Sequence, residues 1–183
     1  FIDNEIAILA SRFDEIKIYH VALPLIEPWI TSYGSDYEIH SILINVKSNN
    51  YSAWSETCAL ELPTYSYESA NSIFFNISEI FGPSLIKKNF ETPYEVINEL
   101  SLFKGNPFAK AGLDIAWWNL KSEITNTPLH ILLGGSRDLV VAGADFGIEK
   151  DIDTLLEKIN LAVENKAPRI KLKVKKGWDF DVI

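Results

Sequence analysis

The chain of 183 residues has a net charge of −8 and a pI near 4.9, which argues against nucleic-acid binding and against binding to a membrane surface. Its 47% hydrophobic and 23% charged residues are ordinary for a soluble globular protein with one large or two small domains. The single cysteine, Cys58, excludes an internal disulfide framework; it predicts a reducing, cytoplasmic environment and a small buried side chain. No apolar run approaches the ~20 residues that span a bilayer. The start at Phe1 and the early end predict a piece of a longer protein.

The first quarter of the chain predicts an antiparallel sheet. Alternating apolar and polar residues favour strands over residues 16–24, 39–46 and 51–58. The segments Glu27–Gly34 and Leu60–Ser66 are expected to be loops, because both are rich in polar and aromatic residues and the first carries Pro28. Loops carried by rigid strands are where ligand contacts tend to lie.

The middle of the chain predicts helices over residues 69–81, 94–102 and 108–124. Thr92-Pro93 and Asn106-Pro107 are start signals for the second and third helices. The third helix has the clearest apolar stripe, and its charged residues are expected to face water: Lys110, Asp114 and Lys121. Trp117-Trp118 could form a stacking platform for a ligand, but Trp117 lies on the stripe, which favours core packing.

The last 45 residues predict a strand, a helix and a second strand. Residues 139–148 form an almost continuous apolar run that fits a strand buried on both faces, and residues 152–163 show a helical stripe. In the second strand Ile170, Leu172 and Val174 alternate with Lys171, Lys173 and Lys175. This order is typical of a parallel βαβ unit.

The lysine face of that strand has two interpretations. Lysines inside a barrel mouth would be partly desolvated and would repel one another, and both effects lower a lysine pKa toward the value a general base needs. The same alternation also fits a surface strand with solvated lysines, and the pattern alone favours that second interpretation.

Four sequence blocks carry a family resemblance: Pro24–Gly34, Gly105–Trp118, Leu132–Gly135, and Lys171–Lys173 with Gly177–Asp179. In this order they resemble the enolase superfamily, its muconate-lactonizing subgroup, and within it the o-succinylbenzoate synthases and N-acylamino acid racemases. The resemblance reverses the preference for solvated lysines.

This resemblance implies an α+β capping domain, an antiparallel sheet plus helices, over residues 1–135. Residues 136–183 are then the first strand, helix and second strand of a truncated α/β barrel, the (β/α)7β modified TIM barrel. It also implies proton abstraction next to a carboxylate, with Mg²⁺ stabilising the enolate, because members of the superfamily combine a Lys or His base with this ion. Lys173 matches the base and Lys171 its supporting cation, and Thr31, Ser32 and Tyr33 fall in the loop that closes over the substrate.

Two features depart from the family pattern. The metal ligands are expected beyond residue 183, so none is assigned here, and the 183 residues alone are expected to be inactive. Asp145 lies where a small hydroxyl residue is expected; it either reshapes carboxylate binding, as a substrate-binding residue, or caps the following helix.

The implied parent activity is o-succinylbenzoate synthase, a syn dehydration in menaquinone biosynthesis. The alternatives are an N-acylamino acid racemase or dipeptide epimerase, and a non-catalytic fragment, which an intact mass of 20.7 kDa would favour. The expected partner is a small-molecule carboxylate, with no nucleic acid and no membrane, in a homo-oligomer. His20, His40 and His130 lack metal-ligand spacing, and Glu61 and Glu68 are expected to be solvated.

Overall fold

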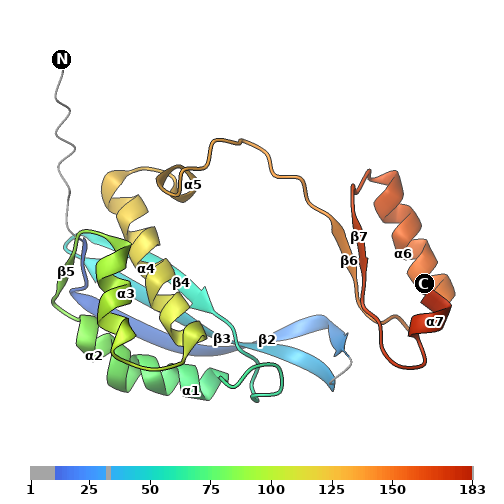
Figure 1. Ribbon diagram of the computed structural model, residues 1–183, viewed down its shortest axis with the longest axis horizontal. Helices are drawn as coiled ribbons and strands as arrows, with labels where there is room; N and C mark the ends of the chain where they lie inside the picture. Colours follow the sequence, from blue (N-terminus) through green and yellow to red (C-terminus); the bar gives the residue numbers. More distant parts are fainter. Residues whose placement is uncertain (1–10, 32–33, 183) are drawn as a thin grey trace. The chain divides into compact units, whose positions relative to one another are not determined.

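The computed structural model describes residues 11–31 and 34–182, which divide into two compact units (Figure 1). The described residues of the first unit are 11–23 and 39–136, and those of the second are 24–31, 34–38 and 137–182. Residues 24–31 and 34–38 are therefore grouped with the last part of the chain, although the sequence places them among the first strands.

The predicted antiparallel strands form a sheet of order β2-β3-β4, of which residues 15–23 of β2, residues 39–48 of β3 and all of β4 belong to the first unit. Strand β3 (Gly34–Ser48) pairs with β4 (Tyr51–Thr57) in a register that runs from Ile42↔Thr57 to Ser48↔Tyr51. The segment Leu60–Ser66 has neither helix nor strand, as predicted. A second, short antiparallel pair joins β1 (Ser11–Arg12) to β5 (Asn89–Phe90).

The prediction of a loop over Glu27–Gly34 is wrong for the described residues. Strand β2 (Glu15–Thr31) continues through Pro24 and Pro28, and β3 resumes at Gly34. Because β2 is an edge strand, a proline can occupy it without losing a hydrogen bond to a second neighbour. The prolines therefore mark an edge and not the end of the strand.

The first predicted helix is divided into three segments: α1 (Ala70–Phe75), a π-helical segment η1 (Asn76–Phe81) and α2 (Gly82–Leu85). Ser69 and Ser72 form a reciprocal capping box at its start. The widening follows from Pro83, whose ring would collide with the carbonyl four residues before it in a regular α-helix. The backbone N–H of Gly82 accordingly donates to Ile77 O, five residues back.

Helices α3 (Pro93–Ser101) and α4 (Pro107–Thr125) begin where the proline signals predict, but the residues expected to cap them do not do so. The side chains of Thr92 and Asn106 make no capping hydrogen bond. The carboxylate of Glu68 accepts from the backbone N–H groups of Phe108, at 2.8 Å, and Ala109, at 3.1 Å. Glu68 is 2% exposed, so the prediction that it is solvated is wrong: it caps α4 from 40 residues earlier in the chain.

Helix α4 packs directly on β4 at Gly112. A Cβ there would lie 2.8 Å from Ile44 Cδ1 and 2.9 Å from Thr57 Cγ2, so a larger residue would push the helix off the sheet. The hydroxyls of Ser55 and Thr57 donate to the carbonyls of Gly112 and Phe108, at 2.7 and 2.8 Å. These contacts fix the helix on the sheet both along its axis and across it.

The core prediction for α4 is confirmed, with one correction. Leu113, Ala116 and Leu120 are fully buried, and Trp117 is buried with its Nε1 donating to Phe90 O at 3.3 Å. Lys110, Asp114 and Lys121, all expected to face water, are half-buried. Asp114 Oδ1 has no hydrogen-bond partner among the described residues, and burial raises the pKa of this carboxyl.

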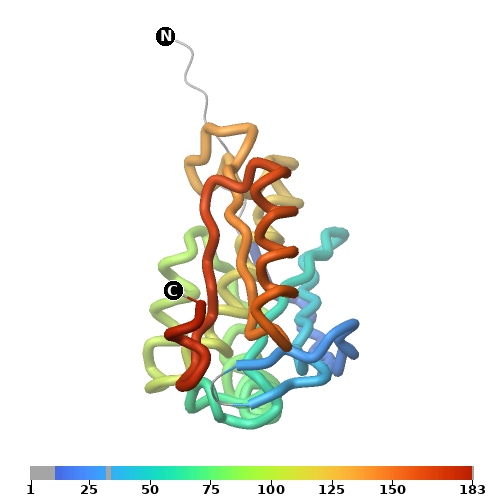
Figure 2. Tube along the Cα trace, turned by 90° about the vertical axis from the view of Figure 1, so that its right-hand side faces the viewer, coloured from blue at the N-terminus to red at the C-terminus, as the bar shows by residue number. Residues whose placement is uncertain are grey.

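The second unit holds the predicted parallel βαβ segment (Figures 1 and 2). Strand β6 (Ala144–Phe146) pairs with β7 (Ile170–Leu172), and α6 (Ile152–Glu164) lies beside them. The strand predicted over residues 139–148 is much shorter. Leu139, Val140 and Val141 are exposed and not in a strand, because no described strand pairs with them. The remaining helices are α5 (Leu129–Leu132), in the first unit, and α7 (Asp179–Val182), in the second.

Two further observations concern the protein surface. Cys58, predicted to be buried, is exposed, and its Sγ donates to His40 O at 3.4 Å. Across the described ranges, no helix combines the length and the apolar character needed to cross a membrane.

We predict that Glu68→Ala destabilises the first unit, because two backbone N–H groups at the buried start of α4 lose their acceptor. The expected loss is about 2–6 kcal/mol of unfolding free energy, from about 1–3 kcal/mol for each of the two unsatisfied buried groups. Urea unfolding followed by tryptophan fluorescence measures it, since Trp117 lies in this core.

Glu61→Ala is the matched control, because Glu61 is exposed and lies in the neighbouring irregular segment. Glu68→Gln retains one acceptor oxygen and should lose less than the alanine variant. Equal unfolding curves for the Glu68→Ala and Glu61→Ala variants would contradict the capping role.

Candidate functional site

Three cationic residues in and beside β7 lie on one face of the strand pair in the second unit. Arg169, Lys171 and Lys173 alternate along the chain, so their side chains share a face. The neighbouring strand places Asp145 directly opposite Lys171. Lys173 follows the last residue of β7 and still donates its backbone N–H to Phe146 O at 3.0 Å. The carboxyl end of a parallel strand is where barrel enzymes carry their chemistry.

Asp145 neutralises one of these lysines. Its Oδ2 lies 2.9 Å from Lys171 Nζ, and its Oδ1 lies 3.8 Å from the Arg169 guanidinium. The hydrogen bond from Lys171 lowers the pKa of the Asp145 carboxyl, which therefore stays charged at neutral pH. The helix-capping alternative for Asp145 is wrong, since Asp151 caps α6 by accepting from the backbone N–H of Thr154 at 2.7 Å.

Lys173 has a lowered pKa, which is the property that a general base on this strand would need. Partial burial lowers the pKa of its ammonium, the charge of Lys171 lowers it further, and the carboxylate of Asp145 opposes both effects. Desolvation and repulsion by a like charge favour the neutral amine, which can accept a proton. The interpretation of a fully solvated lysine face therefore does not hold for Lys173.

The end of β2 also belongs to the second unit and contacts this site. Trp29 covers Lys173, whose Nζ lies 3.8 Å from the centroid of the ring. Thr31, predicted to bind substrate, is 8% exposed, and its hydroxyl donates to Gly34 O at 3.1 Å. Ser32 and Tyr33 lie outside the described residues.

The sequence did not predict a role for Trp29, because Pro24 and Pro28 led to the prediction of a loop where β2 continues. Once residues 24–31 are recognised as a strand, Glu27, Trp29 and Thr31 share one face. Two residues of that face contact the end of the chain, since Glu27 approaches Lys158 and Trp29 covers Lys173.

The described residues offer no ligand set for a metal. Within residues 11–31 and 34–182, no three His, Cys, Asp or Glu side chains gather closely enough to hold one. His20 Nε2 lies 3.0 Å from His40 Nδ1, a pair that the sequence separation concealed. Two imidazoles without a third ligand fall short of a zinc site.

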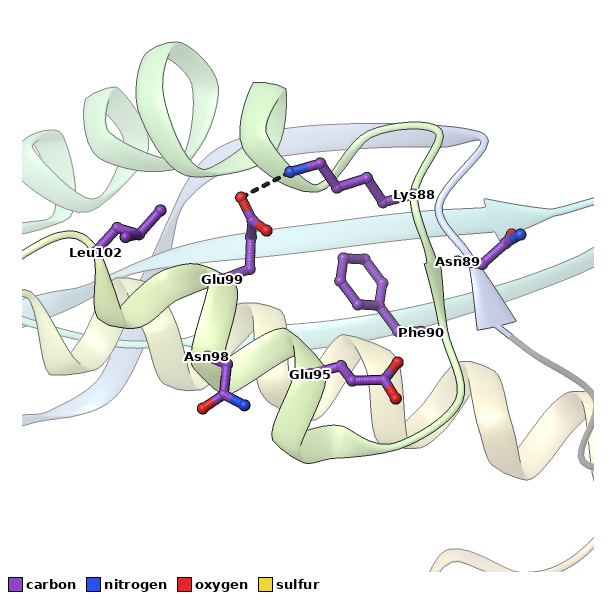
Figure 3. Close-up of a pocket in the computed structure, with 7 residues that line it drawn as sticks. All are labelled: Lys88, Asn89, Phe90, Glu95, Asn98, Glu99 and Leu102. Atoms are coloured by element: carbon purple, nitrogen blue, oxygen red, sulfur yellow. Dashed lines mark hydrogen bonds and ion pairs between the residues drawn. The ribbon is translucent and has the colours of Figure 1, made fainter.

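A shallow pocket of about 550 Å³ lies between α3 and β5 in the first unit (Figure 3). Its charged side chains are already engaged. Lys88 Nζ points to Glu99 Oε1 at 2.7 Å, and Glu95 accepts from the backbone N–H of Glu91 at 2.8 Å. The residues that line the pocket therefore offer no free charge to orient a ligand, and the lysine face of β7 is the stronger candidate.

Comparison with known proteins identifies relatives of both predicted kinds. Residues 14–134 match the family described as mandelate racemase / muconate lactonizing enzyme, N-terminal domain. An o-succinylbenzoate synthase of Geobacillus kaustophilus is 32% identical over 176 residues, covering 96% of this chain and 47% of that protein. An N-succinylamino acid racemase of Thermus thermophilus is 29% identical over 172 residues, covering 94% of this chain and 47% of that protein.

Solved structures give the same result for the fold. An enolase-superfamily member from Enterococcus faecalis has a TM-score of 0.83 at 31% identity, over 94% of this chain and 47% of that one. A member from Listeria innocua has a TM-score of 0.86 at 27% identity, over 93% of this chain and 46% of that one. The chain thus spans about half the length of these relatives. The predicted fold class, an α+β capping domain followed by the start of an α/β barrel, is confirmed.

We predict that Asp145→Asn lowers the pKa of Lys173. The substitution removes an attractive negative charge, and it leaves the charge of Lys171 uncompensated, so both consequences act in the same direction. NMR titration of lysine ¹³Cε resonances, with Lys173 assigned by Lys173→Arg, measures the shift.

Lys171→Met should move the pKa of Lys173 the opposite way, because it removes the repulsion and frees Asp145. Asp153→Asn is the control, since Asp153 is exposed on α6 and carries the same charge as Asp145. The electrostatic account fails if the two substitutions at residues 145 and 171 shift the pKa of Lys173 in the same direction.

Proposed function

We propose that this chain, which belongs to the mandelate racemase / muconate lactonizing enzyme family, supplies the capping domain and the base of an enzyme that abstracts a proton next to a carboxylate. The capping domain comprises residues 1–135, and residues 136–183 begin the barrel. The observation that carries the proposal is Lys173: it lies at the carboxyl end of a parallel strand, its pKa is lowered, and other cations share its face.

The charges on this face fit an anionic substrate. Three cationic side chains, Arg169, Lys171 and Lys173, share the face with one carboxylate, Asp145, so the face is net positive. Such a face attracts a carboxylate and stabilises the further negative charge that develops when its α-proton leaves.

The proton transfer can be written from these residues. The free amine of Lys173 takes the proton, a C–H bond breaks, and its electron pair stays on the substrate as an enolate. Lys171, held by Asp145 at 2.9 Å, places a second positive charge beside the enolate. In the reverse sense the ammonium of Lys173 can donate.

We propose o-succinylbenzoate synthase as the activity of the complete protein, with a place in menaquinone biosynthesis. In a syn elimination the proton and the hydroxyl leave from one face of the substrate. One lysine can therefore serve first as base and then as acid to release water. The 32% identity to a synthase supports this assignment.

Racemisation of N-acylamino acids is the second candidate. It needs a further acid or base on the opposite face of the substrate. The 29% identity to an N-succinylamino acid racemase supports this second candidate. Thr31, Ser32, Tyr33 and Asp145 remain proposed substrate-binding residues for either reaction.

Mg²⁺ belongs to the proposal for the complete protein, with ligands outside the described residues. The carboxylate nearest the lysines, Asp145, is bound to Lys171 and does not fit a metal ligand. No step above depends on the ion. A homo-oligomeric assembly and a cytoplasmic location remain predictions.

We predict that Lys173→Ala in the complete protein abolishes α-proton abstraction, with a loss on the order of 10²–10⁴-fold or more. Lys171→Ala should weaken abstraction strongly but less, because it removes a supporting charge and not the acceptor. Deuterium exchange at the α-carbon, followed by ¹H NMR alongside a dehydration assay, measures both. Near wild-type exchange in the Lys173→Ala variant would show that the base is another residue.

We also predict that residues 1–183 alone bind no Mg²⁺ at millimolar or tighter affinity and turn over no substrate. Mg²⁺ requires near-octahedral oxygen ligation, and the described residues gather no suitable group. Calorimetric titration with Mg²⁺ and the same exchange assay test this. Stoichiometric binding with turnover would place the metal site within this chain.

A further inference from the structure

The contact between Trp29 and Lys173 joins the end of β2 to the candidate base. Lys173 Nζ lies 3.8 Å from the centroid of the Trp29 ring, which is close for a cation–π pair. Both residues belong to the second unit. Trp29 is 51% exposed, so burial in a core does not by itself account for its position.

A second contact holds the same face of β2. Glu27, two residues before Trp29, directs its Oε2 toward Lys158 Nζ on α6 at 3.7 Å. Lys158 is in turn held by Glu149 at 2.8 Å. Exposed pairs of this kind add little stability, but they orient a strand end. The alternation of a strand then presents Trp29 to the lysine.

The charged neighbours of Lys173 are committed elsewhere. The carboxylate of Asp145 lies 2.9 Å from Lys171 Nζ and 3.8 Å from the Arg169 guanidinium. Lys171 and Arg169 are themselves cations and cannot stabilise the ammonium of Lys173. Among the described residues Lys173 forms no ion pair within 4 Å, and the face that its ammonium meets is the indole of Trp29.

The physical effect of this face depends on the charge of Lys173. The electron-rich face of an indole attracts an ammonium ion and has little attraction for a neutral amine. When Lys173 takes a proton, its nitrogen gains charge, so the contact strengthens toward the transition state. An interaction that is stronger in the transition state than in the ground state accelerates the step.

We propose that Trp29 is a positioning residue for Lys173, whose indole face holds the ammonium that forms when the lysine accepts the α-proton. The inference rests on the proposed role of Lys173 and adds a residue of β2 to the proton transfer. The C–H electron pair remains on the substrate as the enolate, and the new N–H bond forms on Nζ beneath the ring.

The test compares Trp29→Leu and Trp29→Phe in the complete protein. Leucine keeps an apolar cover but has no π face, and phenylalanine keeps a smaller one. In the leucine variant we expect kcat to fall about 3- to 30-fold, in the dehydration assay or in α-proton exchange of an N-succinylamino acid, whichever reaction the wild type catalyses. The acid limb of the kcat/KM profile should move to lower pH, because the ammonium loses a stabilising contact. Phenylalanine should restore part of both effects.

Trp54→Leu is the matched control. Trp54 is 54% exposed on β4 and packs against Tyr19, with ring centroids 5.6 Å apart, in the first unit. Its substitution should leave the pH profile unchanged. An unmoved acid limb in Trp29→Leu, with a change in KM or thermal stability alone, would reduce Trp29 to a packing residue and overturn the inference.

A second readout separates this inference from the proposed function. The pKa of Lys173 is measured without substrate by NMR titration in wild type and in both Trp29 variants. A lower pKa in Trp29→Leu, partly restored by phenylalanine, supports the contact even if the wild type shows neither dehydration nor α-proton exchange. That absence of activity would contradict only the proposed function. The same pKa in all three proteins overturns the inference, whatever the activity.

Discussion

The first unit depends on the carboxylate of Glu68 at the start of α4. A helix begins with backbone N–H groups that have no partner within the helix, and those of Phe108 and Ala109 lie in a buried region. Glu68 supplies both acceptors. Gly112 then allows the helix to lie directly on β4, and the hydroxyls of Ser55 and Thr57 bind its carbonyls. The sheet that contains β2 is thereby held against a helix that cannot slide.

The second unit depends on a balance of charge along β7. Lysines spaced two residues apart on one strand face repel each other, and a fully cationic face would be costly to bring together. The register of the parallel pair places Asp145 opposite Lys171 and not opposite Lys173. Lys171 is therefore held in an ion pair, while Lys173 keeps a lowered pKa. A shift of one residue in this register would take Asp145 to the other face of the pair.

The features that the sequence predicted correctly follow local periodicity. The stripe of α4 and the parallel βαβ order both follow from spacings of two, three or four residues. The perturbed lysine does not: the alternation alone favoured solvated lysines, and only the family resemblance reversed that preference. Glu68 was misjudged because its partners lie 40 residues away, and no local pattern shows a cap supplied across that separation. Residues 139–143 were misjudged for a related reason. Hydrophobicity indicates that a segment can be buried, but a strand also needs a neighbour for its backbone hydrogen bonds.

Lys173 illustrates why a base needs opposing influences. A lysine with its ordinary pKa is almost entirely protonated at neutral pH and cannot accept a proton, whereas a very low pKa would make the amine too weak a base. Burial and the charge of Lys171 lower the pKa, and Asp145 raises it. An indole face 3.8 Å from Nζ favours the protonated form and so acts on the same side as Asp145, but without adding a negative charge beside an anionic substrate. An aromatic ring can therefore support the ammonium in a place where a second carboxylate would repel the substrate.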